Sequence, residues 1–224
     1  MTTRLFLIRH GATVLTAEDR FAGSTDVELS DAGCAQAEAL ARRLADDNVT
    51  AVYASPLKRT MLTAAIIGEP HRLSPMPRDG LREIDHGRWE GLRRVDVETQ
   101  FADEYNAWEE DPYSFAPAGG ESGISVLARA LPVIREIVLQ HNGENVVVVS
   151  HKATIRLIIS SLLGFDARGY RDRLDQSPAC LNVLDFKSPV RARLMVFNDV
   201  SHYVDQPPRS DGRLSKWWDR DQPA

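Results

Sequence analysis

The sequence predicts an α/β protein, a three-layer α/β/α sandwich with a mostly parallel central sheet and a small helical cap insertion. Residues 5–8 and 146–149 are short, continuous apolar runs that end in polar residues, which is typical of strands buried on both faces. Segments with helical apolar spacing alternate with strands, and the chain closes with a strand pair. That alternation indicates helices on both faces of one sheet.

The first half of the chain supplies two helices and two further strands. Ser30 is a good N-cap for a helix over residues 31–47, whose apolar positions would face the sheet. Residues 51–54 predict a strand, and a proline suits the first position of a helix over residues 56–67. Residues 72–77 contain two prolines and predict at best an edge strand.

The second half adds a cap and completes the sandwich. Residues 93–111 predict one amphipathic helix whose aromatic stripe would pack a small cap. A long helix follows Ser122. Its apolar face is expected to contain Ile124, Leu127, Leu131, Ile134 and Val138. Residues 153–163 predict a helix stopped by glycine, and residues 179–186 and 191–197 predict the closing strands.

The domain organisation follows from this pattern. A chain of 224 residues fits one large domain with an insertion. We expect a domain over residues 1–205 with a cap insertion at about residues 86–120. Residues 206–224 are rich in Pro, Asp, Arg and Ser and predict an extended C-terminal tail.

Composition excludes several classes of partner. A net charge of −5 argues against a general nucleic-acid binder, and no apolar run approaches the ~18 residues of a membrane span. Cys34 and Cys180 lack metal-ligand spacing and are expected to be reduced thiols. The N-terminus runs directly into the first strand, so no signal peptide is expected. We therefore expect a cytoplasmic protein without nucleic-acid or membrane partners, and a homodimer is compatible with the sequence.

Histidines follow both of the most apolar strands. Arg9 and His10 come directly after residues 5–8, and His151 follows residues 146–149. Taken alone, Arg9 could pair with a carboxylate and His10 could be a core histidine. Because the carboxyl ends of parallel strands meet at one sheet edge, two such histidines indicate a shared ligand site. Arginine is suited to phosphate or carboxylate, and histidine can be a nucleophile near neutral pH.

A further cation and a mixed loop support an anion site. Arg59 lies in the first turn of the helix predicted over residues 56–67, where the helix end itself favours anions, although a solvated arginine is the alternative. Residues 81–91 mix acidic, basic and aromatic residues between glycines, which is typical of an active-site loop.

Together these segments resemble the histidine phosphatase superfamily, also called the phosphoglycerate mutase-like family, from about residue 3 to residue 200. The matching segments, in the family's order, are Arg-His-Gly-Ala-Thr at 9–13, Asp-Val-Glu-Leu-Ser at 26–30, Ser-Pro-Leu-Lys-Arg-Thr at 55–60, Leu-Arg-Glu at 81–83, Gly-Gly-Glu-Ser at 119–122 and Val-Ser-His at 149–151. No segment after His202 contributes to the resemblance.

The resemblance implies a role for each matching side chain. His10 would take the phosphoryl group as the nucleophile, and Glu83 would be the general acid and then the base. Arg9, Arg59 and His151 would surround the phosphoryl oxygens, and His151 would be most useful there if protonated, as a third cationic donor. Candidates for further contacts to the phosphate are Thr13, Gly23, Ser24 and Lys152. No metal and no cofactor are expected, and the substrate would be a small phosphorylated metabolite.

Phosphatase and mutase are the two activities to separate. Mutases of this family carry a longer basic insertion with a Glu-Arg-His-Tyr-Gly motif, where this chain has Glu-Ile-Asp-His-Gly at 83–87. The insertion at 86–120 is short and net acidic, and Asp85 discourages a second anion beside the leaving group. The sequence therefore favours a phosphatase, with a cofactor-dependent mutase as the alternative.

Two other classes of protein fit less well. A catalytically silent phosphate-binding module would be expected to lack a member of the set His10, Arg59, Glu83 and His151, and all are present. A metallohydrolase would need histidines and carboxylates at ligand spacing. The remaining histidines, which show no such spacing, are His71, His86, His141 and His202.

Overall fold

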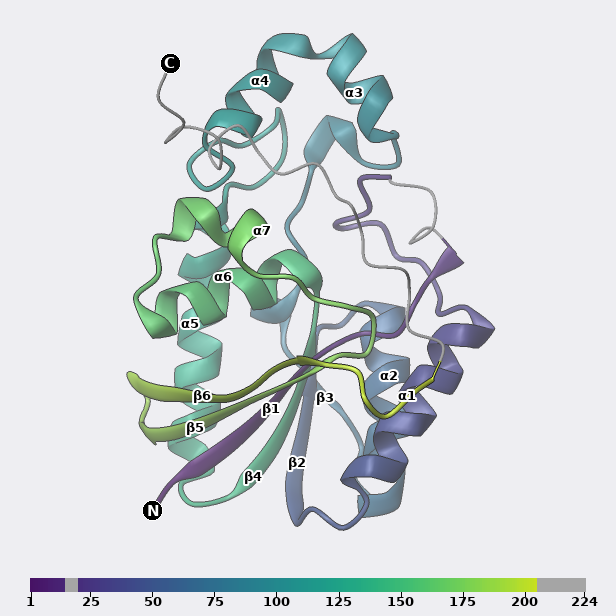
Figure 1. Ribbon diagram of the computed structural model, residues 1–224, viewed down its shortest axis with the longest axis vertical. Coiled ribbons are helices and arrows are strands. Elements are labelled where there is room, and N and C mark those ends of the chain that lie inside the picture. The colour runs from purple at the N-terminus through teal and green to yellow at the C-terminus, as the bar shows by residue number, and fades with distance from the viewer. Residues whose placement is uncertain (15–19, 205–224) are drawn as a thin grey trace.

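The computed structural model describes residues 1–14 and 20–204, and its centre is one six-stranded sheet (Figure 1). The strands lie in the order β3-β2-β4-β1-β5-β6. Their bounds are β1 Thr3–Arg9, β2 Val49–Ala54, β3 Met76–Pro77, β4 Asn145–Ser150, β5 Leu181–Ser188 and β6 Arg191–Asp199. Strands β1 to β4 are parallel, whereas β5 pairs antiparallel with both β1 and β6. The predicted α/β class with a mostly parallel sheet is confirmed.

Helices cover both faces of this sheet. They are α1 Asp31–Leu44, α2 Lys58–Gly68, α3 Arg94–Gln100, α4 Ala102–Glu110, α5 Gly123–Gln140, α6 Lys152–Leu163 and α7 Tyr170–Arg173. Single turns of 3-10 helix lie at Glu69–His71, Asp79–Leu81, Gly87–Trp89 and Ala167–Gly169. Leu5 and Leu7 of β1 pack with α5 and α6, whereas Phe6 and Ile8 pack with α1 and α2. Because successive side chains of a strand point to opposite faces, the continuous apolar run fills both layers.

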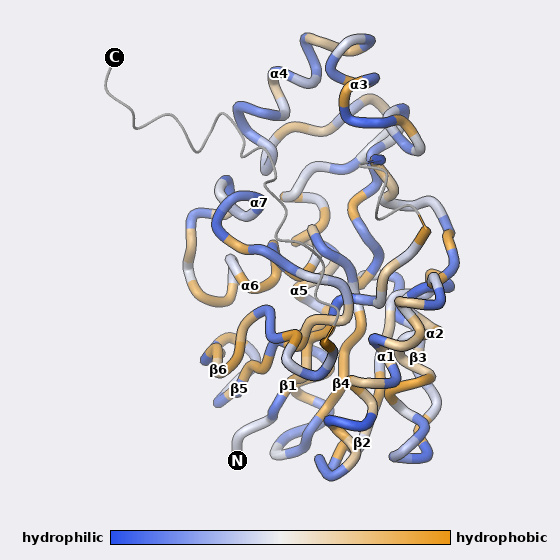
Figure 2. Tube along the Cα trace, turned by 45° about the vertical axis from the view of Figure 1, so that its right-hand side comes forward, coloured by the Kyte–Doolittle hydropathy of each residue, from blue (hydrophilic) through white to orange (hydrophobic). Residues whose placement is uncertain are grey.

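Hydropathy along the chain follows this layering. Figure 2 shows hydrophobic residues gathered in the central strands, with α3 and α4 mostly hydrophilic. No helix in residues 1–14 and 20–204 is long and apolar enough to cross a membrane. The tail predicted over residues 206–224 lies outside the described residues.

The register of the two central strands places the histidines together. Arg9 of β1 lies opposite Ser150 of β4, and the backbone N–H of His10 donates to the carbonyl of Ser150 at 3.1 Å. The next residue of each strand therefore leaves the sheet at the same edge. Gly11 then crosses α1 so closely that a Cβ there would lie 2.3 Å from the carbonyl oxygen of Gly33. Only glycine fits that crossing.

The first residues of helices α1 and α2 can be compared with the helix starts predicted from the sequence. Ser30 caps α1 as expected, and its hydroxyl accepts from the N–H of Gly33 at 3.2 Å. Helix α2 begins at Lys58, two residues later than predicted, with Leu57 as an extended N-cap. Its first N–H donates to Asp26 at 2.8 Å, so a side chain distant in sequence sets this boundary.

Helix α5 turns one expected core residue outward. Ile124 is 48% exposed, whereas Val126 and Ala130 are fully buried. The first residue, Gly123, packs so closely on α6 that a Cβ would lie 3.1 Å from the side chain of Leu157. The first turn therefore faces α6 through glycine, and the following residue points to solvent.

The predicted cap helix is two helices. Its backbone breaks at Phe101 (φ −130°, ψ 45°), which separates α3 from α4. Val97, Tyr105 and Trp108 nevertheless share one buried cluster with Trp89. The break lets both short helices turn apolar faces onto this cluster, and Figure 1 shows them together, away from the sheet.

Candidate active site

His10 lies buried at the carboxyl end of β1. Its Nδ1 lies 2.8 Å from the carbonyl oxygen of Gly11, so that nitrogen carries the proton. The Nε2 atom is then left with its lone pair. Burial, together with the charges of Arg9 and Arg59, holds the pKa of His10 well below its usual value. At neutral pH the ring is uncharged, which is the form in which imidazole is a nucleophile.

His151 lies beside His10, with ring centroids 5.2 Å apart in an edge-on arrangement. Its Nε2 is 2.8 Å from the hydroxyl of Ser55, while Nδ1 is buried and has no hydrogen-bond partner within residues 1–14 and 20–204. In the tautomer in which the Ser55 hydroxyl donates to Nε2, Nδ1 carries a proton that none of the described residues accepts. A buried donor without a partner is costly, so Nδ1 marks the place of a ligand oxygen.

The surroundings of His151 do not favour the protonated ring that the resemblance implies. Burial comes first among the causes that hold its pKa well below the usual value, followed by His10, Arg59 and Arg9. Charging a fully buried ring among arginines is unfavourable. A neutral His151 still donates one hydrogen bond through Nδ1, so it can act as a donor without being a cation.

Two arginines flank the histidines. Arg9 donates from Nη1 to the carbonyl of Gln176 at 2.6 Å, and its buried Nε has no partner among the described residues. Arg59 donates to the carbonyls of Thr25 and Gly23 at 2.7 and 2.8 Å. Backbone oxygens from two separate loops therefore fix both guanidinium groups without neutralising them. Their positive charge remains available to a phosphoryl group.

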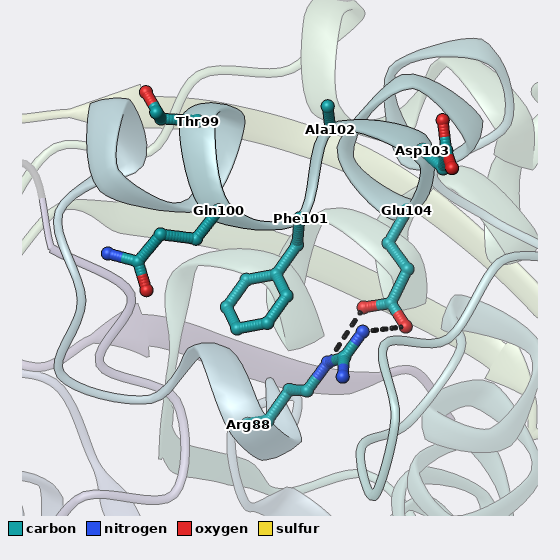
Figure 3. Close-up of a pocket in the computed structure, with 7 residues that line it drawn as sticks. All are labelled: Arg88, Thr99, Gln100, Phe101, Ala102, Asp103 and Glu104. Carbon is teal, nitrogen blue, oxygen red and sulfur yellow. Dashed lines mark hydrogen bonds and ion pairs between the residues drawn. The ribbon is translucent and has the colours of Figure 1, made fainter.

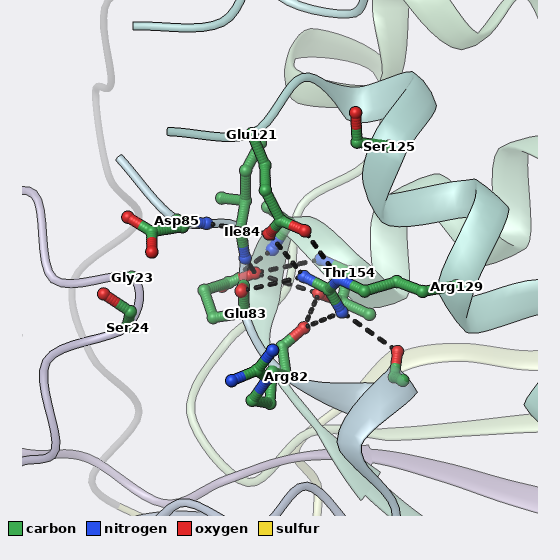
Figure 4. A network of polar contacts seen from close by, with 12 residues as sticks. Gly23, Ser24, Arg82, Glu83, Ile84, Asp85, Glu121, Ser125, Arg129 and Thr154 are labelled. Atoms are coloured by element: carbon green, nitrogen blue, oxygen red, sulfur yellow. Dashed lines mark hydrogen bonds and ion pairs between the residues drawn. The ribbon is translucent and has the colours of Figure 1, made fainter. Parts of the chain in front are cut away.

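Glu83 lies beside Thr154 (Figure 4), a residue in the first turn of α6, the helix that begins directly after His151. Its Oε1 accepts from the N–H groups of Thr154 and Ile84 at 3.1 and 3.0 Å, while the Thr154 hydroxyl donates to the carbonyl of Arg82 at 2.8 Å. Its Oε2 accepts from the N–H of Ala153 at 3.1 Å and from no other group in the described part of the chain. Oε2 is therefore the oxygen with room for a proton.

Arg129 of α5, which the sequence did not single out, holds the loop that carries Glu83. It donates to the carbonyls of Gly80, Arg82 and Glu83 at 2.8 to 3.0 Å. Glu121 pairs with the same guanidinium through two hydrogen bonds of 2.7 and 2.8 Å. Figure 4 shows Arg129 reaching across from α5 to this loop. Glu83 is thus supported on its backbone side as well as at its carboxylate.

Glu90 is a second residue that the sequence did not single out. Its carboxylate accepts from the backbone N–H groups of Gly23, Ser24 and Thr25 and of His86, and from the Thr25 hydroxyl, at 2.7 to 3.2 Å. Although burial raises the pKa of Glu90, the bonds from Thr25, His86 and Ser24 lower it below its usual value. Glu90 therefore holds the same loop whose carbonyls fix Arg59.

The further candidates for phosphate contacts lie at or near this edge. The N–H groups of Gly23 and Ser24, expected near phosphate, donate to Glu90 instead, so the loop acts on the site through Arg59. Thr13 is buried and bridges to Leu29. Lys152 begins α6, with Nζ 3.5 Å from Asp175. Phosphate contacts of Thr13, Gly23, Ser24 and Lys152 stay predictions.

Substitution of Glu90 by glutamine is expected to raise both KM and the inhibition constant of inorganic phosphate by about 10-fold or more. The amide has one oxygen and cannot accept all the hydrogen bonds that the carboxylate accepts. The 23–25 loop therefore loses its fixed position, and so does Arg59, which is held by carbonyls of that loop. Glu104→Gln is the matched control, because Glu104 pairs with Arg88 in the cap and not with the 23–25 loop. Unchanged phosphate inhibition in Glu90→Gln would contradict this positioning role.

A hollow of about 350 Å³ on the cap lies apart from these residues (Figure 3). Arg88 lies over the ring of Phe101 at 4.2 Å and pairs with Glu104 at 2.6 Å. The other lining residues are Thr99, Gln100, Ala102 and Asp103. No candidate nucleophile or phosphate ligand lines it, so we assign it no chemistry.

Comparison with known proteins identifies the family. The model of the histidine phosphatase superfamily (branch 1) matches residues 5–199. The chain belongs to the histidine phosphatase superfamily. Phosphoserine phosphatase 1 of Hydrogenobacter thermophilus is 37% identical over 163 residues, which cover 73% of this chain and 77% of that protein. Glucosyl-3-phosphoglycerate phosphatase of Mycolicibacterium vanbaalenii is 34% identical over 168 residues, covering 72% and 74%.

Solved structures of the superfamily share the fold. A mycobacterial glucosyl-3-phosphoglycerate phosphatase in complex with VO3 has a TM-score of 0.79 and 32% identity, covering 87% of this chain and 98% of that one. Bacillus stearothermophilus YhfR has a TM-score of 0.84 and 27% identity, covering 89% and 98%. Membership of the histidine phosphatase superfamily and the names of the relatives support a phosphoric monoester hydrolase, with a phosphohistidine intermediate as a general feature of the family.

Proposed function

We propose that this histidine phosphatase hydrolyses small phosphorylated metabolites without a metal ion, using His10 as the nucleophile and Glu83 as the proton donor and acceptor. One observation carries the proposal. The His10 ring is buried and neutral, its Nδ1 is tied to a backbone carbonyl, and two arginines flank it. A neutral nucleophile among fixed cations suits attack on a phosphoryl group.

The first half of the reaction transfers the phosphoryl group to the protein. His10 Nε2 forms a bond to phosphorus while the bond from phosphorus to the leaving oxygen breaks, and Glu83 gives that oxygen its proton. Arg9, Arg59 and the Nδ1–H of His151 surround the three phosphoryl oxygens. Because the transferred group is highly charged, these fixed donors supply much of the catalysis.

The second half releases inorganic phosphate. Glu83, now a carboxylate, takes a proton from water as that water attacks phosphorus and the bond to His10 Nε2 breaks. The donors from Thr154 and Ala153 keep the same carboxyl group in place for both steps.

We expect turnover of phosphomonoesters to be unchanged in excess EDTA. Within residues 1–14 and 20–204, no group of three or more His, Cys, Asp or Glu side chains is arranged to hold a metal ion. The arginines provide the positive charge that a metal would otherwise supply. Hydrolysis of a panel of small phosphomonoesters, with and without EDTA, tests the proposal. Loss of turnover in EDTA, restored by a divalent metal, would contradict it.

For the substrate we propose a chemical class, and for the protein a cellular location. The two relatives described above are named for phosphoserine and glucosyl-3-phosphoglycerate, both small phosphorylated metabolites, and we propose a substrate of that class. The unpaired Cys34 and Cys180 support a cytoplasmic location. A homodimer stays a prediction. We favour hydrolysis over phosphoryl transfer between substrates because the sequence has Asp85 two residues after Glu83 and a short, net acidic insertion, which would repel a second anionic substrate.

A further inference from the structure

Two cations of α6 continue the active site beyond His151. Lys152 and Arg156 lie one turn apart on this helix, and both reach the same oxygen of Asp175. The distances to Asp175 Oδ1 are 3.5 Å from Lys152 Nζ and 3.1 Å from Arg156 Nη2. The same oxygen also accepts from the N–H of Gln176 at 2.8 Å. One carboxylate oxygen is therefore shared among three donors.

This cluster is continuous with the phosphoryl pocket. Arg9 donates to the carbonyl of Gln176, the residue that follows Asp175. The charge of Arg9 also acts on both Lys152 and Arg156 and contributes to lowering the pKa of each. A substrate phosphoryl group beside Arg9 would thus have the two α6 cations as its neighbours on this side of the pocket.

Positive charge exceeds negative charge in the cluster. Asp175 is the one carboxylate paired with Lys152 and Arg156 among the described residues. Arg156 is only 9% exposed, and its buried Nε has no hydrogen-bond partner in the described ranges. Burial, followed by neighbouring charges, lowers the pKa of Lys152 to about 8 and that of Arg156 to about 10. An additional anion would relieve this surplus and offer the guanidinium a second acceptor.

We propose that Lys152 and Arg156 form a subsite for a second oxyanion, a carboxylate or a phosphate, carried on the leaving group of the substrate. The inference rests on the proposed phosphatase activity and narrows its substrate class to phosphomonoesters with two anionic groups. Asp175 holds the two cations side by side. Lys152 and Asp175 are 37% and 53% exposed in their side chains, so the cluster is open to a ligand from solvent.

Matched substrate pairs test the subsite. The carboxylate arm compares 3-phosphoglycerate with glycerol 3-phosphate, and the phosphate arm compares fructose 1,6-bisphosphate with fructose 1-phosphate. For at least one pair we expect kcat/KM to be about 10-fold or more higher for the substrate with the second anion. The arm that shows this preference identifies the group that the subsite takes.

Variants then locate the preference. Arg156→Gln and Lys152→Gln are each expected to reduce the ratio of kcat/KM within the preferred pair by about 10-fold. Arg156→Lys should retain part of the ratio, because it keeps the charge and loses the planar fork. Arg168→Gln is the control and should leave the ratio unchanged, since Arg168 forms an exposed ion pair with Asp166. A purely structural role would lower kcat/KM for both substrates of a pair equally.

The outcomes separate the two proposals. If the protein hydrolyses none of these substrates and does not hydrolyse p-nitrophenyl phosphate either, the proposed phosphatase activity is overturned. Hydrolysis of both members of every pair with equal kcat/KM, or an equal loss for both in the variants, would overturn the subsite alone. Lys152 is the more exposed of the two cations, so Lys152→Gln decides the matter if Arg156→Gln does not fold.

Discussion

Replacement of His10 by alanine is expected to abolish phosphoenzyme formation and to lower kcat for every phosphomonoester by about 10⁴-fold or more. The alanine has no atom that can accept the phosphoryl group, and water would have to attack directly. Rapid-mixing and steady-state assays with p-nitrophenyl phosphate measure both losses. Phosphate binding should survive, because Arg9 and Arg59 are fixed by backbone carbonyls rather than by His10.

His71→Ala is the matched control for this variant. His71 lies in the 3-10 turn after α2, and within residues 1–14 and 20–204 its side chain forms no hydrogen bond or ion pair with a residue assigned to the reaction. Its kcat should equal that of the wild type, and thermal unfolding should show that both variants are folded. Substantial turnover by folded His10→Ala would remove His10 from the nucleophile's role.

Substitution of Glu83 by glutamine is expected to lower kcat/KM by about 10²- to 10⁴-fold for alkyl phosphates and far less for aryl phosphates. A departing alkoxide needs the proton that the amide cannot give. A nitrophenolate leaves as a stable anion without that proton. In the wild type, Thr154 and Ala153 donate to two different carboxylate oxygens. Glutamine has one oxygen for both hydrogen bonds, so its side chain is expected to be less well ordered.

Pre-steady-state kinetics separate the two duties of Glu83. With p-nitrophenyl phosphate, Glu83→Gln should release a burst of nitrophenolate and then turn over slowly, because no base activates water for the second step. Glu136→Gln, on the solvent side of α5, is the control and should behave as the wild type. Equal losses for alkyl and aryl substrates in the burst phase would mean that Glu83 only maintains the shape of the pocket.

The centre of the site could be predicted because local patterns determine it. Four consecutive apolar residues define β1 and β4, and a parallel sheet brings the ends of neighbouring strands to one edge. His10 and His151 follow from that rule alone. Arg59 follows from the helix start that precedes it, even though α2 begins two residues later than expected.

The supports of the site could not be predicted in the same way. Glu90 accepts hydrogen bonds from a loop 65 to 67 residues earlier in the chain. Arg129 donates to carbonyls 46 to 49 residues earlier. In sequence, Arg129 is one polar position of an amphipathic helix and resembles a solvated side chain. Contacts between distant segments depend on how the loops pack, and no periodicity reports that packing.

The same reasoning applies to the errors in detail. The expected charge on His151 followed from the needs of a phosphate ligand, whereas the full burial of its ring lowers its pKa. The single helix expected over residues 93–111 breaks at Phe101 because two short helices cover the cap cluster around Trp89. In both cases the tertiary environment outweighs the local pattern.

The most direct test of the mechanism is chemical identification of the intermediate. Wild-type protein and Glu83→Gln, quenched during turnover of a 32P-labelled phosphomonoester, should carry a label that is labile to acid and stable to base. Peptide mapping should place it on Nε2 of His10, because Nδ1 is held by the carbonyl of Gly11. The label should persist longest in Glu83→Gln and be absent from His10→Ala. An acid-stable label, or one on any residue other than His10, would contradict the mechanism.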